Sequence, residues 1–223
     1  MKQIFYFILL LLLSLRGYSQ NMLMFKDAIL PKPKTTDTLI VKWNKTQPDY
    51  KSLSSTEQQF YYWTNYSRAY PSLFFDSVVK PIIEIYPQLK GPNSVSLEND
   101  LKTLRSLPLL ALNPALLKMA AFHAGDITSH DANPSHTSTT GETFVDRFKR
   151  FSLKNCGGEN ISYGAPNIDP VFMLVLLYLD INVSDLGHRK ALLNPAFLNT
   201  GLAAYTYKNG NIFIVEDFAC VQN

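Results

Sequence analysis

The chain has 223 residues, of which 46% are hydrophobic and 17% are charged, and its formal net charge is +3. This length and composition predict one folded domain with a sizeable core and exclude an intrinsically disordered chain. Basic residues barely exceed acidic ones and form no patch interleaved with aromatic residues, so we expect no nucleic-acid partner.

The first 20 residues have the pattern of a secretory signal peptide. Lys2 provides a positive start, residues 4–13 are apolar, and small residues at positions 17 and 19 precede an expected cleavage point near residue 20 or 21. A membrane anchor is the alternative, but a bilayer span needs about 20 apolar residues, and Arg16 interrupts this run. We therefore expect a secreted, extracytoplasmic protein whose mature chain has no transmembrane span. Loss of Lys2 and Arg16 leaves a formal charge of +1.

Residues 21–52 are expected to form an N-terminal arm or linker ahead of a main domain that covers residues 53–223. The arm contains the segment Pro31-Lys32-Pro33 and several threonines, which is typical of irregular structure. One short alternating run, Thr38 to Trp43, predicts a single strand. The expected role of the arm is that of a linker or of a strand added to a sheet edge.

Helix signals begin at Ser54. Ser54 and Glu57 have the spacing of a capping box, and apolar residues recur after them at helical intervals, which predicts a helix over residues 56–69. A second apolar stretch covers residues 73–86, and Pro81 within it should end or kink a helix.

Asn113 and Pro114 supply a helix cap followed by a first-turn proline, which predicts another helix from residue 114. His123 and Asp126 lie three residues apart on this helix and could share a proton or a ligand. We favour the simpler interpretation, in which His123 lies at the edge of the core and is hydrogen-bonded to the neighbouring acid.

Asp169 and Pro170 repeat the cap signal before residues 171–179, which are apolar on every face. This run is too short to cross a bilayer, so it predicts a buried central helix that ends at Asp180.

The pattern becomes strand-like near the C-terminus. Two apolar runs, 201–207 and 211–218, are separated by a segment with Asn209 and Gly210, the strongest short signal for a β-hairpin. Residues 161–164 are a candidate third strand. Several helices followed by a few antiparallel strands predict a layered α+β domain.

The only two cysteines, Cys156 and Cys220, form an even pair that can oxidise to a disulfide in an exported protein. Such a bond would join the segment of Glu159 to the C-terminal strand. Two buried free thiols are the alternative. A nucleophilic Cys156 is a third interpretation, but nothing near it indicates a lowered thiol pKa.

Two histidines and two acids, His136, Glu159, Asp180 and His188, are candidates for a functional site. Imidazole nitrogens and carboxylate oxygens bind zinc-like ions, and the same groups act as general acid and base near neutral pH. His136 and His188 are therefore candidate ligands for Zn²⁺ or another divalent metal, and Glu159 and Asp180 are candidate catalytic acid/base residues. The alternative is a structural hydrogen bond between Glu159 and His188 that only holds two layers together.

The order of these motifs resembles the CAP superfamily, which comprises cysteine-rich secretory proteins, insect antigen 5, plant pathogenesis-related proteins and many exported bacterial proteins. The resemblance covers residues 53–221 and is carried by His136, Arg147-Phe148, Gly158-Glu159-Asn160-Ile161, Asp180, Gly187-His188-Arg189, Gly201 and Asp217-Phe218-Ala219. The segment from Leu53 to Pro71 resembles the bacterial secreted branch.

The resemblance implies an α-β-α sandwich with a small, mainly antiparallel central sheet and an open cleft. The cleft would hold the tetrad His136, Glu159, Asp180 and His188. Asp180 departs from the family pattern, because many relatives have the longer glutamate there. His130 is an alternative to His136, but the residues around His136 fit the family pattern better.

Relatives in this family have diverse assigned roles, and three classes of function follow. We favour a ligand-binding or interaction module for a small apolar ligand such as a lipid, a cell-envelope component or a protein, since the chain lacks a Gly-x-Ser-x-Gly elbow and a His-Glu-x-x-His helix. The second class is a metal-assisted hydrolase or protease, with Glu159 or Asp180 as base for a metal-held water. The third is a structural extracellular domain with a vestigial site. Arg147 and Arg189 are interpreted as positioning or salt-bridge residues and not as anion binders.

Overall fold

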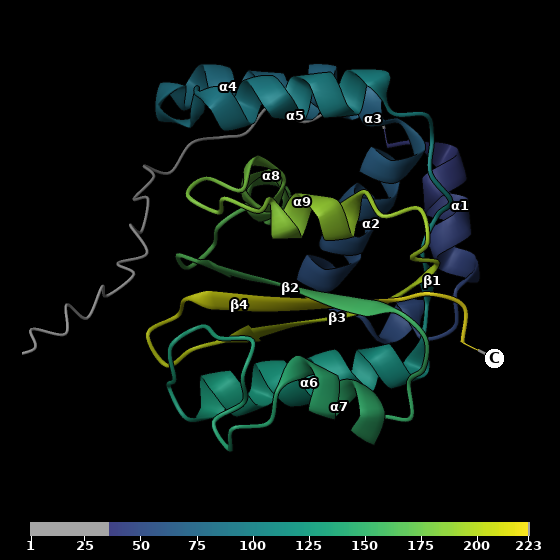
Figure 1. The fold of residues 1–223 in the computed structure, drawn as a ribbon, viewed down its shortest axis with the longest axis vertical. Coiled ribbons are helices and arrows are strands. Elements are labelled where there is room, and N and C mark those ends of the chain that lie inside the picture. Colours follow the sequence, from purple (N-terminus) through teal and green to yellow (C-terminus); the bar gives the residue numbers. More distant parts are fainter. Residues whose placement is uncertain (1–35, 223) are drawn as a thin grey trace, which may run out of the picture.

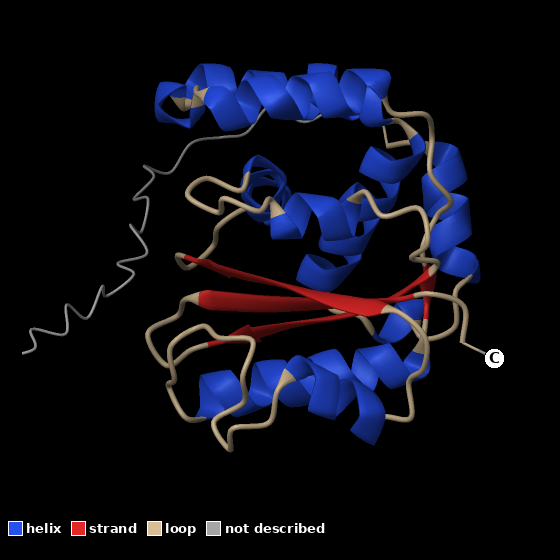
Figure 2. Ribbon diagram, viewed as in Figure 1, coloured by secondary structure: helices blue, strands red, loops and turns tan. Residues whose placement is uncertain are grey.

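The computed structural model describes residues 36–222 (Figure 1). The predicted signal peptide and the first part of the predicted arm lie outside this range. Helices cover both faces of a central sheet, as Figure 2 shows, which confirms the expected α+β class and its α-β-α arrangement. No helix within residues 36–222 has the combined length and apolarity that a bilayer span requires.

The sheet in the described part of the chain has four strands in the order β1-β3-β4-β2. Strand β1 pairs with β3 in parallel, whereas the β3–β4 and β4–β2 pairs are antiparallel, so the sheet is mainly antiparallel as expected. This order places β2 at one edge. The strands are β1 (Ala111–Leu112), β2 (Gly157–Gly164), β3 (Asn199–Thr206) and β4 (Ile212–Ala219).

The β3–β4 hairpin confirms the prediction from Asn209 and Gly210. Gly210 has a φ of +87°, a left-handed conformation that glycine adopts without steric cost. The turn is closed by a 2.8 Å hydrogen bond from the Tyr207 N–H to the Asn211 carbonyl. The third strand, β2, contains the predicted residues 161–164 and begins earlier, at Gly157.

Helices form layers on the two faces of the sheet (Figure 1). One face is covered by α6 (Pro114–Ser129) and α7 (Phe144–Arg150), and the other by α2 (Ser55–Ala69), α8 (Pro170–Leu179) and α9 (Gly187–Leu192). An outer layer beyond α8 consists of α3 (Pro71–Phe74), the π-helical segment η2 (Phe75–Val79), α4 (Lys80–Ile85) and α5 (Pro92–Thr103). The remaining elements are α1 (Thr38–Thr46), which packs on α2, and the 3-10 turns η1 (Tyr50–Ser52) and η3 (Pro87–Leu89).

Three helix starts predicted from the sequence are confirmed. Ser54 and Glu57 form the capping box of α2, and Asn113 and Asp169 cap α6 and α8 with their side chains. Glu57 has a second role, because its Oε1 accepts a 2.9 Å hydrogen bond from the Ala204 N–H of β3. The cap of α2 therefore also attaches that helix to the sheet.

The strand predicted from Thr38 to Trp43 is wrong, because these residues lie in helix α1. The Asp37 side chain accepts a 2.9 Å hydrogen bond from the Ile40 N–H and so caps the helix. Ile40 and Asn44 are both buried, and their spacing of four residues is that of one helix face. Packing of this face against α2 outweighs the short alternating pattern.

Two features of the outer layer follow from prolines. Pro81 lies in the first turn of α4, and the turn before it, η2, is π-helical, so the proline interrupts the α-helical pattern without ending helical structure. Pro92 occupies the first turn of α5, a helix that was not predicted from the sequence.

The expected hydrogen bond between His123 and Asp126 is wrong. His123 is buried, and its Nε2 donates to the Ser135 carbonyl over 2.7 Å. Asp126 instead accepts hydrogen bonds from the backbone and hydroxyl groups of Thr139, both 2.6 Å long. Both side chains therefore hold the loop of residues 130–143 against α6.

Gly201 sets the distance between α6 and β3. A Cβ atom at this position would lie 2.2 Å from the backbone of Leu116 and Leu117, and neither backbone group can move without displacing α6. We expect Gly201→Ala to lower the free energy of unfolding by about 3 kcal/mol, measured by urea denaturation. Gly91→Ala is the matched control, because no atom lies within 4 Å of its added Cβ. Equal losses in the two variants would contradict the close approach.

Glu216 should make the stability of the protein depend on pH. The side chain is fully buried, and burial raises its pKa to about 8. The folded protein therefore keeps a proton that the unfolded chain releases near the usual glutamate pKa, so stability is lost as the pH rises toward about 8. We expect the melting temperature of wild type to fall relative to that of Glu216→Gln between about pH 5 and 9. The exposed Glu98→Gln should instead follow wild type; parallel curves for wild type and Glu216→Gln would contradict this prediction.

Candidate functional site

The structure brings all four candidate residues together beside the edge strand β2. We call the group of His136, Glu159, Asp180 and His188 the histidine site. The rings of His136 and His188 face each other with centroids 6.5 Å apart and an angle of 26° between their planes. His136 comes from the loop after α6, whereas His188 comes from α9. The two rings therefore approach from opposite faces of the sheet.

The first half of the site is built on β2. Glu159 Oε1 lies 2.8 Å from His136 Nδ1, and Glu159 Oε2 lies 2.5 Å from Arg147 Nη2. The side chain of Arg147 is 0% exposed and that of Glu159 is 1% exposed. Arg147 Nη1 also donates to the carbonyl groups of His136 and Glu142 and to the Ser138 hydroxyl. Arg147 therefore fixes the acid and the loop that carries His136.

The electrostatics of Glu159 follow from these contacts. Burial alone would raise the pKa of this carboxyl, but the hydrogen bond from His136 and the charge of Arg147 together hold the pKa below its usual range. Glu159 is thus a carboxylate at neutral pH.

The second half of the site is built at the end of α8. Asp180 is the residue that ends this helix, in a left-handed conformation with φ of 49°. Asp180 Oδ1 lies 2.5 Å from His188 Nδ1, and Oδ2 accepts a 2.9 Å hydrogen bond from the Arg189 N–H. The Asp180 carbonyl accepts a 2.7 Å hydrogen bond from the Asn93 side chain of α5. Asp180 is therefore fixed on both its side chain and its backbone.

Arg189 connects this half of the site to the outer layer. Its guanidinium donates to the Tyr178 carbonyl of α8 and to the Asn93 carbonyl, the Ser96 hydroxyl and the Asp100 carboxylate of α5. Both arginines are thus positioning residues, as expected from the sequence, and each is almost completely buried.

The imidazoles of the site are exposed to solvent, whereas its acids are buried. The His136 and His188 side chains are 51% and 22% exposed, whereas those of Glu159 and Asp180 are 1% and 0% exposed. Because each Nδ1–H donates to a carboxylate, each Nε2 carries the lone pair that can accept a proton or bind a metal. The accessible chemistry of the site is therefore that of two imidazole Nε2 atoms with carboxylates behind them.

The two imidazole Nε2 atoms are the exposed donor atoms of the histidine site. No group of three or more His, Cys, Asp or Glu side chains within residues 36–222 is arranged to hold a metal ion. Carboxylates that accept from the Nδ1–H of a histidine are nevertheless the usual support of metal-binding imidazoles. Two imidazole donors would leave the remaining coordination positions of a divalent ion to water or to a bound molecule.

The structure distinguishes between the alternatives for the partner of Glu159, for the histidine of the site and for the two cysteines. The expected pairing of Glu159 with His188 is wrong, because Glu159 bonds to His136 and His188 bonds to Asp180. His130 lies at the end of α6, is exposed, and bonds to the Asp126 carbonyl at 2.8 Å, so His136 is the histidine of the site. Cys156 and Cys220 are joined in a disulfide that links the residue before β2 to the residue after β4.

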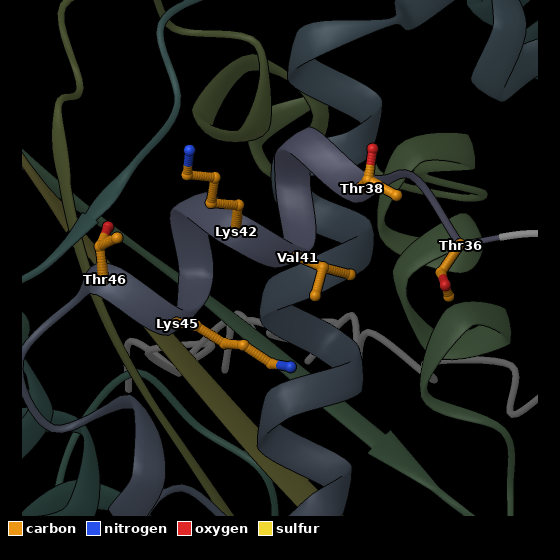
Figure 3. A pocket seen from close by; sticks show the side chains of 6 residues that line it. All are labelled: Thr36, Thr38, Val41, Lys42, Lys45 and Thr46. Carbon is orange, nitrogen blue, oxygen red and sulfur yellow. The ribbon is translucent and has the colours of Figure 1, made fainter.

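Residues 36–222 also form surface hollows outside the histidine site, including the following two. The first, of about 380 Å³, is lined by residues of α1 and the residues before it, Thr36, Thr38, Val41, Lys42, Lys45 and Thr46 (Figure 3). The second, of about 500 Å³, lies between α5 and α9 and includes Asp100, Arg189 and Lys190. The second hollow is thus adjacent to the residues that support His188.

Comparison with known proteins identifies the family. The model of the cysteine-rich secretory protein family, CAP, matches residues 95–223, which is more than half of the chain. The chain therefore belongs to the CAP family, and the resemblance noted from its motifs is confirmed.

The solved structures that are similar to the chain include the following two. An extracellular protein containing an SCP domain from Bacillus anthracis str. Ames has 25% sequence identity and a TM-score of 0.48, over 78% of this chain and 44% of that one. An outer surface protein from Borrelia burgdorferi has 18% identity and a TM-score of 0.43, over 64% of this chain and 92% of that one. The chain thus spans less than half the length of the Bacillus protein. The comparison with curated proteins found no match.

Arg147 should be essential for stability as well as for the site. Arg147→Met leaves the Glu159 carboxylate buried without its cation, which should cost about 3–5 kcal/mol of unfolding free energy. Arg150→Met on the same helix is the control, because Arg150 is 45% exposed and contacts Glu142 and the Phe122 ring at the surface. Its loss should cost about 1 kcal/mol. Urea denaturation compares the two, and a cost for Arg147→Met no larger than that for Arg150→Met would show that the buried pair is not needed.

Proposed function

We propose that this CAP domain is an extracytoplasmic binding module that uses His136 and His188 to bind a polar group of its ligand, with a divalent cation such as Zn²⁺ held between the imidazoles. The observation that carries the proposal is the combination of orientation and exposure in the histidine site. Each ring is fixed by a buried carboxylate at Nδ1, and each ring is exposed to solvent. Such rings are preorganised to bind through Nε2.

The fixed orientation lowers the cost of binding. A ligand or ion that contacts a freely rotating side chain must offset the lost conformational freedom of that side chain, on the order of 1 kcal/mol for each one. In the histidine site this freedom is already lost on folding, because the imidazoles are hydrogen-bonded to Glu159 and Asp180 and the rings lie nearly parallel.

Zn²⁺ suits the donor set. Neutral imidazole is a common zinc ligand, and structural zinc sites use four protein ligands. Two imidazoles leave coordination positions that water or a ligand would fill, so the ion would attach a ligand to the protein. The expected ligand classes are a lipid or other small apolar molecule with a polar end, a cell-envelope component, or a partner protein.

Burial of the acids favours binding over hydrolysis. A metal-assisted hydrolase needs a base that reaches the metal-held water. Glu159 and Asp180 lie behind the imidazoles with exposures of 1% and 0%, and the lowered pKa of Glu159 makes it a weak base. The same carboxylates serve well as supports for the histidines.

The extracytoplasmic assignment rests on the signal pattern of residues 1–20 and on the Cys156–Cys220 disulfide. Disulfides persist in oxidising compartments and are rare in the cytosol.

Zinc binding tests the proposal directly. Untagged mature protein should bind one Zn²⁺ in a calorimetric titration, and His136→Ala and His188→Ala should each weaken binding at least about tenfold, since each removes one of two protein ligands. His130→Ala is the matched control, because this exposed histidine lies outside the site. Equal affinity in wild type and all three variants would exclude the proposed metal site. Mass spectrometry of the purified protein and capture on isolated cell-envelope material would then separate the ligand classes.

A further inference from the structure

Strand β4 carries two consecutive acids, Glu216 and Asp217, that are both 0% exposed. Neighbouring side chains on a strand point to opposite faces, so only one of them faces the histidine site. Asp217 is the register partner of Glu159 on β2 and of Gly201 on β3. Asp217 and Glu159 therefore lie side by side on the face that α6 and α7 cover.

The charges around Asp217 do not balance if the carboxyl groups of Asp217 and Glu159 are both ionised. Arg147 supplies one positive charge, and its Nη2 is bound to Glu159. His123 faces Glu159 and Arg147 from α6. It is buried, and burial lowers its pKa, so it is neutral near pH 7. Two carboxylates would leave an uncompensated negative charge in the interior, which is strongly unfavourable. One proton on the pair removes that charge.

Hydrogen bonding points to the same conclusion. Neither Asp217 oxygen has a donor within residues 36–222, and Arg147 Nε likewise has no acceptor there. Two carboxylates only accept hydrogen bonds, so adjacent ionised groups cannot satisfy one another. A carboxylic acid beside a carboxylate can donate to it.

We propose that Asp217 is a neutral carboxylic acid that donates its proton in a hydrogen bond to Glu159, and that Asp217 is thereby a positioning residue for His136. This inference deepens the proposed function, because it concerns an imidazole of the same site. Asp217 would thus be a buried residue that supports the histidine site from behind Glu159.

The direction of the pKa shifts supports the location of the proton. Burial raises the pKa of Asp217 well above its usual range, and the neighbouring charge of Glu159 raises it further, while Arg147 opposes the change. Arg147 Nη2 is bound to Glu159, whereas no donor contacts Asp217 within residues 36–222, so Asp217 is the acid that keeps the proton.

The consequence for His136 follows from the number of donors on Glu159. Its carboxylate would accept from three groups, His136 Nδ1, Arg147 Nη2 and Asp217. Three donors lower the basicity of Glu159, so the proton between the two groups stays on His136 Nδ1 and the Nε2 lone pair stays available. In the other half of the site, Asp180 accepts a hydrogen bond from the Arg189 N–H. Different donors therefore set the basicity of the two carboxylates.

Infrared and NMR spectroscopy of metal-free protein at pH 7 test the inference. Asp217→Asn should remove one carboxylic-acid C=O band from the infrared spectrum, and the control Glu216→Gln should remove a different one. The ¹⁵N shifts of the His136 imidazole should move in Asp217→Asn, because an amide N–H is a weaker donor to Glu159, and move further in the same direction in Asp217→Leu. They should stay at the wild-type value in Glu216→Gln.

The conservative variant alone decides both parts of the inference. An unchanged set of carboxylic-acid bands in Asp217→Asn would show that Asp217 is ionised, bound for example to Arg147 Nε. Unchanged His136 shifts in the same variant would show that Asp217 does not position His136. Neither readout involves zinc, so failure here is distinguishable from failure of the proposed metal binding.

Discussion

The buried ion pair between Arg147 and Glu159 is the constraint on which the histidine site depends. A carboxylate in this interior needs a cation, and the guanidinium that supplies it also holds three acceptors in the loop of residues 130–143. The same residue therefore satisfies the acid on β2 and presents His136 above it. Stability and site geometry are consequently inseparable in this half of the molecule.

The other half of the site reaches the same geometry by a different route. Asp180 ends α8 in a left-handed conformation, and Asn93 and Arg189 hold it there through contacts that reach α5. The outer helical layer, which does not cover the sheet, thus determines where His188 points. The histidine site is a junction of three layers, and no single supersecondary unit contains it.

Local signals in the sequence predicted the elements, but tertiary contacts determined what lay between them. Caps at Ser54, Asn113 and Asp169 and the Asn209-Gly210 turn act over a few residues, so they could be identified without a structure. The short run from Thr38 to Trp43 was mistaken for a strand because only its packing on α2 reveals the helical face. Asp217 was noted as part of a motif, but its position beside Glu159 depends on the register of β2 and β4, which the sequence alone does not specify.

The arrangement of the four polar residues divides the site into two buried acids and two imidazoles that reach the surface. The acids and arginines are buried and bound to several elements of the fold, so we expect their exchange to lower stability. Under the proposed function, the Nε2 edges of the two exposed imidazoles would contact the ligand. Loops tolerate substitution far better than buried pairs do, so selectivity for a particular ligand would reside in the loops around the site. The histidines would supply a constant point of attachment.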